Sequence, residues 1–206
     1  MPTKTFANLE PEKSKRIIQA ALDEFADKQF EQVNISDIIK QAKIPRGSFY
    51  QYFVDKEDLY LYLIEQIKQE KMNYLANSLF NQGDLNFIAL VRKLYDDGVK
   101  FAIKYPKYVK MLDHLMKNKN GLYEKIMADN IGYAEDIYAD LIEKDKQKGH
   151  IKQGIDTRTF AKIIVQLTTN IAIEELDLTN EEKSYKKMLE RNDQILKIIE
   201  YGVTKG

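Results

Sequence analysis

Basic, hydroxyl and amide side chains are concentrated between residues 34 and 56 of this 206-residue chain. An arginine such as Arg46 can donate two hydrogen bonds to a guanine edge, and Ser48 and Gln51 are suited to other base edges. Phosphate contacts are expected from the tyrosines and lysine of the same segment, Tyr50, Tyr52 and Lys56. The residue types therefore predict contacts with DNA, although lysines and arginines alone would also fit a solvated helix face.

Two short helices joined by a tight turn are expected to carry these side chains. Asn34 is a suitable N-cap for the first helix, and its apolar face is formed at helical spacing by Ile35, Ile38, Ile39 and Ala42. The pattern breaks at Lys43, and Pro45 has the backbone angle that suits the first turn of a second helix. On that second helix, Phe49 and Phe53 are four residues apart and are expected to face inward.

The outward positions of the second helix are Arg46, Gly47, Ser48, Tyr50, Gln51 and Tyr52. A helix of about two turns with such a surface fits the major groove of DNA. The segment is thus predicted to be a DNA-reading helix-turn-helix.

This segment closely resembles the N-terminal domain of the TetR family of transcriptional repressors. The matching residues are Asn34, Ile35, Asp37, Ile38, Ile44, Gly47, Ser48, Phe49, Tyr50, Phe53, Lys56, Glu57 and Leu59. An amphipathic helix precedes the match through Ile17, Ile18, Ala21, Leu22 and Phe25. The resemblance, read together with the polar residues, implies a DNA-contacting set of Asn34, Ser36, Lys43, Pro45, Arg46, Gly47, Ser48, Tyr50, Gln51, Tyr52 and Lys56.

Three residues depart from the family pattern. The family usually has Gly at the positions of Gln29 and Lys43, and Ser or Thr at the position of Pro45. A left-handed backbone at Lys43 would cost roughly 1 kcal/mol relative to Gly, and a lysine there could offset this cost by approaching a phosphate. Pro45 cannot donate a backbone N–H to DNA.

The composition predicts an all-α protein. Only four prolines and nine glycines interrupt the helical periodicity, and no alternating apolar pattern suggests a sheet. The absence of cysteine excludes disulfides, thiol nucleophiles and cysteine-based zinc sites. The net charge is formally zero, so the basic residues around the second helix matter through their distribution. The first fifteen residues lack the apolar core of a secretion signal and no membrane span is evident, so a cytoplasmic location is expected.

Six further helices are expected after the DNA-binding segment, over residues 55–81, 85–105, 108–116, 122–148, 156–176 and 180–203. The helix over 156–176 is apolar around more than one stripe, which fits either contact with another subunit or a buried core helix. The family resemblance implies that the last two helices form a homodimer interface. The expected domains are a DNA-binding domain, 1–58, and a ligand-binding and dimerisation domain, 59–206.

Aromatic and methionine side chains are frequent in the middle helices, and by residue type alone they favour a filled core over a pocket. The resemblance implies instead a pocket for a small, often hydrophobic or aromatic, effector. The candidate lining residues are Phe101, Tyr105, Tyr108, Met111, Leu112, Leu115, Tyr133 and Ile137.

The favoured function is a transcriptional repressor that binds a near-palindromic operator as a homodimer and is released by its effector. Control by a protein partner is a second hypothesis, and an α-helical enzyme is a third. His114 and His150 are the only histidines, and neither has the spacing of a metal site. We expect no catalytic residue, metal or cofactor.

Overall fold

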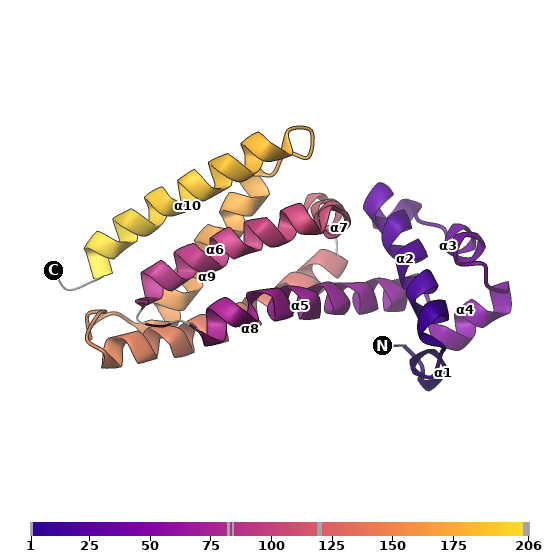
Figure 1. Cartoon of the computed structure of the whole chain (residues 1–206), viewed down its shortest axis with the longest axis horizontal. Coiled ribbons are helices and arrows are strands. Elements are labelled where there is room, and N and C mark those ends of the chain that lie inside the picture. Colours follow the sequence, from indigo (N-terminus) through magenta and orange to yellow (C-terminus); the bar gives the residue numbers. More distant parts are fainter. Residues whose placement is uncertain (1, 82, 84, 119–120, 204–206) are drawn as a thin grey trace. The chain divides into compact units, whose positions relative to one another are not determined.

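The computed structural model describes residues 2–81, 83, 85–118 and 121–203. Within these residues the regular elements are helices, with no sheet, as predicted (Figure 1). Their bounds are α1 (Lys4–Ala7), α2 (Pro11–Asp27), the 3-10 helix η1 (Phe30–Gln32), α3 (Ile35–Ala42), α4 (Arg46–Tyr52), α5 (Lys56–Phe80), α6 (Phe87–Lys104), α7 (Pro106–Lys117), α8 (Gly121–Gln147), α9 (Thr157–Glu175) and α10 (Glu181–Val203). No described helix has an apolar stretch long enough to cross a membrane.

The six helices predicted after residue 55 all form, with every end within two residues of its expected position. The sequence missed α1 and η1, which are only four and three residues long. Such short elements depend on their caps: the Thr3 hydroxyl accepts a hydrogen bond from the backbone N–H of Phe6 at the start of α1. Their formation therefore rests on local polar contacts rather than on an amphipathic pattern.

The chain divides into two compact units, which are described separately. The first unit contains residues 1–72 and 104–123, and the second contains residues 73–103 and 124–206. The first unit thus groups α7 with the N-terminal helices. The predicted DNA-binding domain, residues 1–58, lies wholly within the first unit.

The core of the first unit is largely aromatic. The ring of Phe25 on α2 meets the edge of Tyr60 on α5 at a centroid distance of 4.9 Å. The ring of Phe6 on α1 lies 4.8 Å from that of Phe53, which follows α4. Because Phe25 and Phe53 are almost fully buried, these contacts join α2 and α4 to a common core.

Helix α7 packs against α2 in the first unit. Two polar contacts join α7 to α2: Lys107 Nζ lies 2.5 Å from Asp23 Oδ1, and His114 Nε2 lies 3.2 Å from the Ala26 carbonyl. Just after α7, the Asn118 amide donates to Glu31 in η1. His114 therefore has a structural contact at the last turn of α2. A displacement of α7 would therefore act on α2, which also packs against α3.

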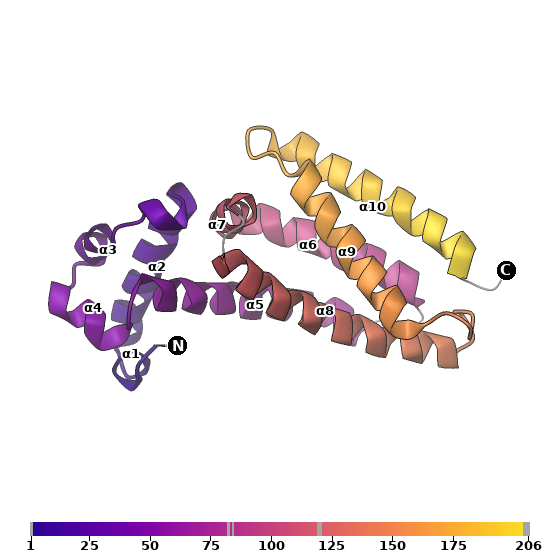
Figure 2. The same ribbon diagram turned by 180° about the vertical axis from the view of Figure 1, so that it is seen from behind.

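The second unit is built around α6, α8, α9 and α10. Val91, Ile142 and Ala161, from three different helices, are fully buried in its core. Asp145 is buried on α8 and accepts hydrogen bonds from the backbone N–H of Phe87 and from His150 Nδ1. Helices α9 and α10 pack side by side, as the views from both sides show (Figures 1 and 2).

Candidate nucleic-acid interface

The first helix of the predicted motif, α3, is positioned by a cap and a buried face. The Asn34 side chain accepts from the backbone N–H of Ser36 at 2.9 Å, which satisfies one of the free N–H groups at the helix start. Ile38 and Ala42 are completely buried, and α3 packs against α2. Asn34 and Ser36 are themselves exposed, so the start of α3 is open to a partner.

The turn after α3 depends on a left-handed lysine. Lys43 has φ 54° and ψ 49°, and it is the only described residue other than glycine with a positive φ. Its backbone N–H and that of Ile44 donate to the carbonyls of Lys40 and Ile39, which satisfies the end of α3. The left-handed backbone considered for Lys43 is therefore present, a conformation that most side chains avoid. The Lys43 side chain is exposed.

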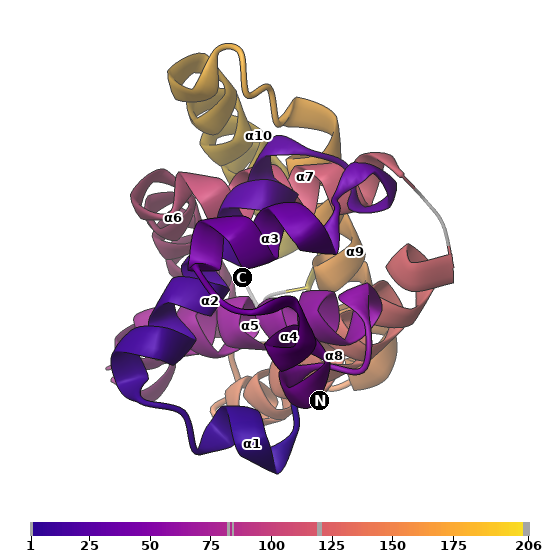
Figure 3. The ribbon, with the colours of Figure 1, turned by 90° about the vertical axis from the view of Figure 1, so that its right-hand side faces the viewer.

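Helix α4 lies beside α1 and α3 (Figure 3) and has one packing face and one exposed face. Pro45 precedes the helix with φ −62°, and its carbonyl accepts from the Ser48 backbone N–H at 2.9 Å. Phe49 and Phe53 are completely buried, as predicted from their spacing. The outward positions, Arg46, Gly47, Tyr50 and Gln51, are exposed, and Ser48 is half-buried.

Gly47 lies on the free face of α4. A Cβ atom built at this position would meet no other atom within 4 Å. The protein's own packing therefore does not require a glycine here. The missing side chain does leave the backbone of α4 open to close approach by a ligand.

The predicted outward orientation of Tyr52 is wrong. Tyr52 is only 3% exposed, and its ring packs edge-on against Phe6 at a centroid distance of 6.0 Å. The backbone N–H of Thr3 donates to the Tyr52 carbonyl, and the Thr3 hydroxyl donates to the Gln51 carbonyl at 2.6 Å. Thr3 thus holds the end of α4, a positioning role that was missed because α1 was not predicted.

The Lys56 side chain also differs from the prediction. Its ammonium donates to the carbonyls of Phe30, Glu31 and Val33 at 2.7, 3.3 and 2.9 Å. The same nitrogen lies 4.6 Å from the centre of the Phe30 ring. An ammonium has three protons, and these three carbonyls occupy its donors. Lys56 therefore closes the loop before α3 and is not available as the expected phosphate contact.

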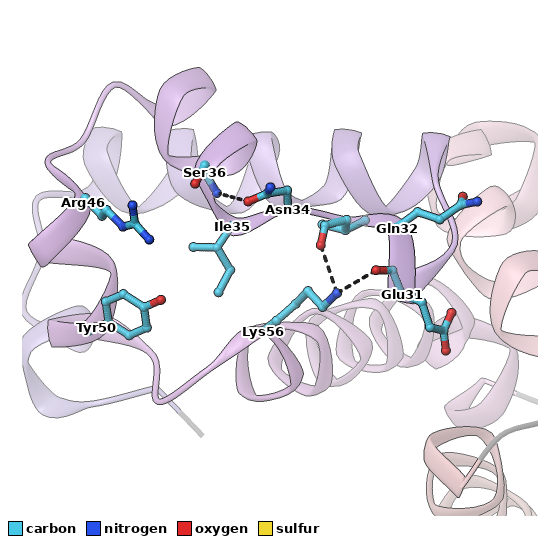
Figure 4. A pocket seen from close by; sticks show the side chains of 9 residues that line it. Glu31, Gln32, Asn34, Ile35, Ser36, Arg46, Tyr50 and Lys56 are labelled. Atoms are coloured by element: carbon cyan, nitrogen blue, oxygen red, sulfur yellow. Dashed lines mark hydrogen bonds between the residues drawn. The ribbon is translucent and has the colours of Figure 1, made fainter.

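A surface pocket of about 330 Å³ lies between the start of α3 and α4 (Figure 4). Its lining residues are Glu31, Gln32, Val33, Asn34, Ile35, Ser36, Arg46, Tyr50 and Lys56. Arg46 and Tyr50 are one helical turn apart on α4 and extend toward Ile35 (Figure 4). The pocket therefore offers an exposed guanidinium and a phenol hydroxyl, groups that bind phosphate oxygens and base edges.

The candidate effector residues fall into both units. In the first unit, the rings of Tyr105 and Tyr108 stack at 5.2 Å, and the Tyr105 hydroxyl lies 2.7 Å from Glu70. Burial raises the pKa of Tyr108. Met111 and Leu115 are buried on α7, and Leu112 beside them is half-buried.

In the second unit, Phe101 is buried and its ring meets Tyr74 edge-on at 5.5 Å. Ile137 packs against the core, whereas Tyr133 is exposed. Within the described residues, no group of three or more His, Asp or Glu side chains could hold a metal ion.

Comparison with known proteins gives consistent matches. Residues 17–63 match the model of the bacterial regulatory proteins of the tetR family. The chain is 28% identical to the fatty acid metabolism regulator protein of Bacillus subtilis over 74% of this chain and 77% of that protein.

Solved structures share the fold. A TetR family transcriptional regulator from Chloroflexus aurantiacus is 28% identical, with a TM-score of 0.66 and complete coverage of both chains. The transcriptional regulator FadR from Bacillus subtilis, solved in complex with stearoyl-CoA, is 18% identical, with a TM-score of 0.71 and coverage of 89% of this chain and 96% of that chain. With the capped α3, the exposed face of α4 and the matched residues 17–63, these findings show that the chain belongs to the TetR family and is a DNA-binding transcriptional regulator, not an enzyme.

Proposed function

We propose that the protein is a homodimeric repressor that reads a near-palindromic operator with α4 and releases it when a small amphipathic effector binds. The observation that carries this proposal is the division of α4 into a packing face and a free face. Phe49 is completely buried, whereas Arg46 and Gln51 are exposed on the same helix. A helix held in this way can enter the major groove without any rearrangement of the core.

Arg46 is proposed to read a guanine, because its guanidinium is exposed and can donate two parallel hydrogen bonds. Gln51 and Ser48 are proposed for neighbouring base edges, and Tyr50 for a phosphate. Asn34, Ser36 and Lys43 are exposed around the pocket and the turn, where they can approach the DNA backbone. At Pro45 and Gly47, the backbone of the protein is proposed to approach the DNA closely, without a contact from either side chain.

Dimerisation is proposed through α9 and α10. Each helix has large apolar side chains that the single chain leaves exposed: Ile163 and Ile173 on α9, and Ile198 and Tyr201 on α10. Ile198 and Tyr201 are 73% and 88% exposed, and exposed apolar area on neighbouring helices is typical of a subunit contact. A two-fold dimer would present two copies of α4 to half-sites about one helical turn of DNA apart.

An amphipathic effector is proposed on two grounds. The Bacillus subtilis relative is a fatty acid metabolism regulator, and FadR was solved with stearoyl-CoA. In this chain α7 carries aromatic and sulfur-containing candidates and is also bonded to α2. An effector that shifts α7 would change the population of DNA-competent dimers. The proposed domains are therefore a DNA-binding domain, residues 1–58, and an effector-binding and dimerisation domain, residues 59–206.

The test is selection of bound duplexes from a random pool with the full chain, followed by sedimentation of the free protein. We expect an enriched near-palindromic site and a dimer in dilute solution. The matched control is Arg46→Ala, which retains the buried face of α4. If the wild-type chain enriches no site, or enriches only an unpaired half-site as a monomer, the proposal is overturned.

A further inference from the structure

The last turn of α4 depends on groups outside the helix. Helix α4 is only seven residues long, and Pro45 before it has no side-chain group that could cap its start. A helix this short is held in place by contacts with the rest of the protein. Its last carbonyls also have no partner within the helix. The groups that bind these carbonyls therefore fix the position of the last turn.

Thr3, which precedes α1, donates two hydrogen bonds to the end of α4. Its hydroxyl donates to the Gln51 carbonyl at 2.6 Å, and its backbone N–H donates to the Tyr52 carbonyl at 3.0 Å. The same hydroxyl accepts from the backbone N–H of Phe6 at 3.4 Å. A hydroxyl has one proton and two lone pairs, so it can make both contacts at once. Thr3 thus joins the start of α1 to the end of α4.

Helix α1 is anchored separately, by the ring of Phe6. This ring is 4% exposed and lies 6.0, 4.8 and 5.6 Å from the rings of Tyr52, Phe53 and Tyr62. Aromatic pairs at such distances stabilise the packing of the elements that carry them. Loss of the Thr3 hydroxyl alone should therefore leave α1 on the core of the first unit.

Gln51 combines a held carbonyl with an exposed side chain. The direction of a side chain follows from the backbone of its own residue. A hydrogen bond weakens steeply when donor and acceptor are misaligned. A change at the Gln51 carbonyl would therefore alter the contact of its amide with a base edge.

We infer that Thr3 is a positioning residue that sets the base preference at the position read by Gln51. This inference rests on the proposed function, and it adds a residue outside the helix-turn-helix to those that determine sequence preference. Binding to random DNA depends on the phosphates that a protein neutralises. The Thr3 contact neutralises none, so its loss should weaken binding to the operator alone.

The test compares the full chain and Thr3→Val, which removes the hydroxyl with little change in size. Binding is measured on the selected operator and on a random duplex of the same length. We expect about a fivefold loss on the operator, the value of one hydrogen bond, and no change on the random duplex. Repeated selection should show a relaxed preference at one base pair of each half-site. Thr3→Ser keeps the hydroxyl and should bind like the wild type.

Thr5→Val is the matched control, since Thr5 is an exposed threonine on α1, and it should also bind like the wild type. Urea unfolding checks that each variant is folded. Thr3→Ala, which also lacks the hydroxyl, replaces Thr3→Val if valine prevents folding.

A double-mutant cycle separates positioning from a purely structural role. Gln51→Ala removes the amide but keeps the carbonyl that Thr3 binds. If Thr3 acts through the Gln51 side chain, Thr3→Val should have little further effect on operator affinity in the Gln51→Ala background.

Three results would overturn the inference: Thr3→Val discriminates between the duplexes as well as the wild type, it weakens binding to both equally, or its effect adds in full to that of Gln51→Ala. Any of these in a chain that enriches an operator refutes this inference alone. A wild type that enriches no operator refutes the proposed function.

Discussion

The ammonium nitrogen of Lys107 on α7 lies 2.5 Å from Oδ1 of Asp23 on α2. The same aspartate accepts hydrogen bonds from Gln19 on α2 and from Gln41 on α3. One carboxylate thus joins α7 to both helices that support the DNA-binding turn. This arrangement gives a direct physical link between the proposed effector helix and the DNA-binding helices.

Loss of this link should uncouple the effector response more than it destabilises the protein. Lys107 is about half exposed, and exposed ion pairs contribute about 1 kcal/mol or less. We expect Lys107→Met to reduce the change in operator affinity caused by effector while the free energy of unfolding changes by less than about 1 kcal/mol. Lys110→Met, an exposed lysine on the same helix, is the control. An undiminished effector response in Lys107→Met would exclude this route.

Arg46→Ala should reduce operator affinity by about 1–3 kcal/mol and relax the sequence preference at one base pair of each half-site. The reason is the loss of two hydrogen bonds to a base edge, with no loss of packing because the side chain is exposed. The measurement compares binding to the selected operator and to a random duplex of the same length. Equal weakening on both duplexes would assign Arg46 to phosphate instead.

Lys56→Met should act on stability rather than on DNA binding. The variant leaves three carbonyls without their charged donor, and the expected loss is about 2 kcal/mol in the free energy of unfolding. The dependence of DNA affinity on salt should keep its slope, because Lys56 neutralises no phosphate. If the slope falls by about one and the stability is unchanged, Lys56 binds a phosphate, as the sequence predicted. Lys40→Met, at an exposed position on α3, should change stability by no more than about 0.5 kcal/mol.

Lys43→Gly should stabilise the fold by about 1 kcal/mol or less, because glycine adopts the left-handed conformation found here without a steric penalty. The same substitution at Lys40, in the last turn of α3, should destabilise the protein by about 1 kcal/mol or less. Urea unfolding of both variants tests whether the two changes in the free energy of unfolding have opposite signs. If both substitutions destabilise the protein, the strain at Lys43 is negligible.

Lys71 should make stability depend on pH in the alkaline range. Its pKa is lower in the folded state than the usual 10.5, so the unfolded chain binds more protons between the folded and unfolded pKa values. Stability should therefore rise with pH across that window, and Lys71→Met should lack this part of the rise. At neutral pH the variant should be close to the wild type in stability, since the Lys71 side chain is exposed. The free energy of unfolding in urea is measured from pH 8 to 10.5 for both proteins. Identical pH profiles for the wild type and Lys71→Met would contradict the prediction.

The long helices were predictable because each has apolar residues at helical spacing over several turns. The inward positions of Phe49 and Phe53 followed from the same rule. Tyr52 and Lys56 were misplaced because their partners come from other parts of the chain: Phe6 for the tyrosine, and the carbonyls of residues 30, 31 and 33 for the lysine. Local periodicity carries no information about such partners.

The position of Lys71 had a signal in the sequence, since a lysine interrupts an otherwise apolar stripe of α5. The sequence could not indicate whether that lysine bends out to the surface, as long charged side chains often do. Accessibility and desolvation at the same residue require the surrounding helices to be in place. The same holds for the effector candidates, whose burial depends on contacts between helices far apart in the chain.

The exposed positions Arg46, Gly47 and Gln51 of α4 lie apart from its buried residues Phe49 and Tyr52. Gly47 has empty space around it, and Arg46 and Gln51 are exposed, so exchanges at these positions leave the hydrophobic interior untouched. A gene duplicate could therefore acquire a new target promoter through a few codon changes, at little risk of misfolding. The same separation makes this helix a convenient place for engineering regulators with altered DNA preferences.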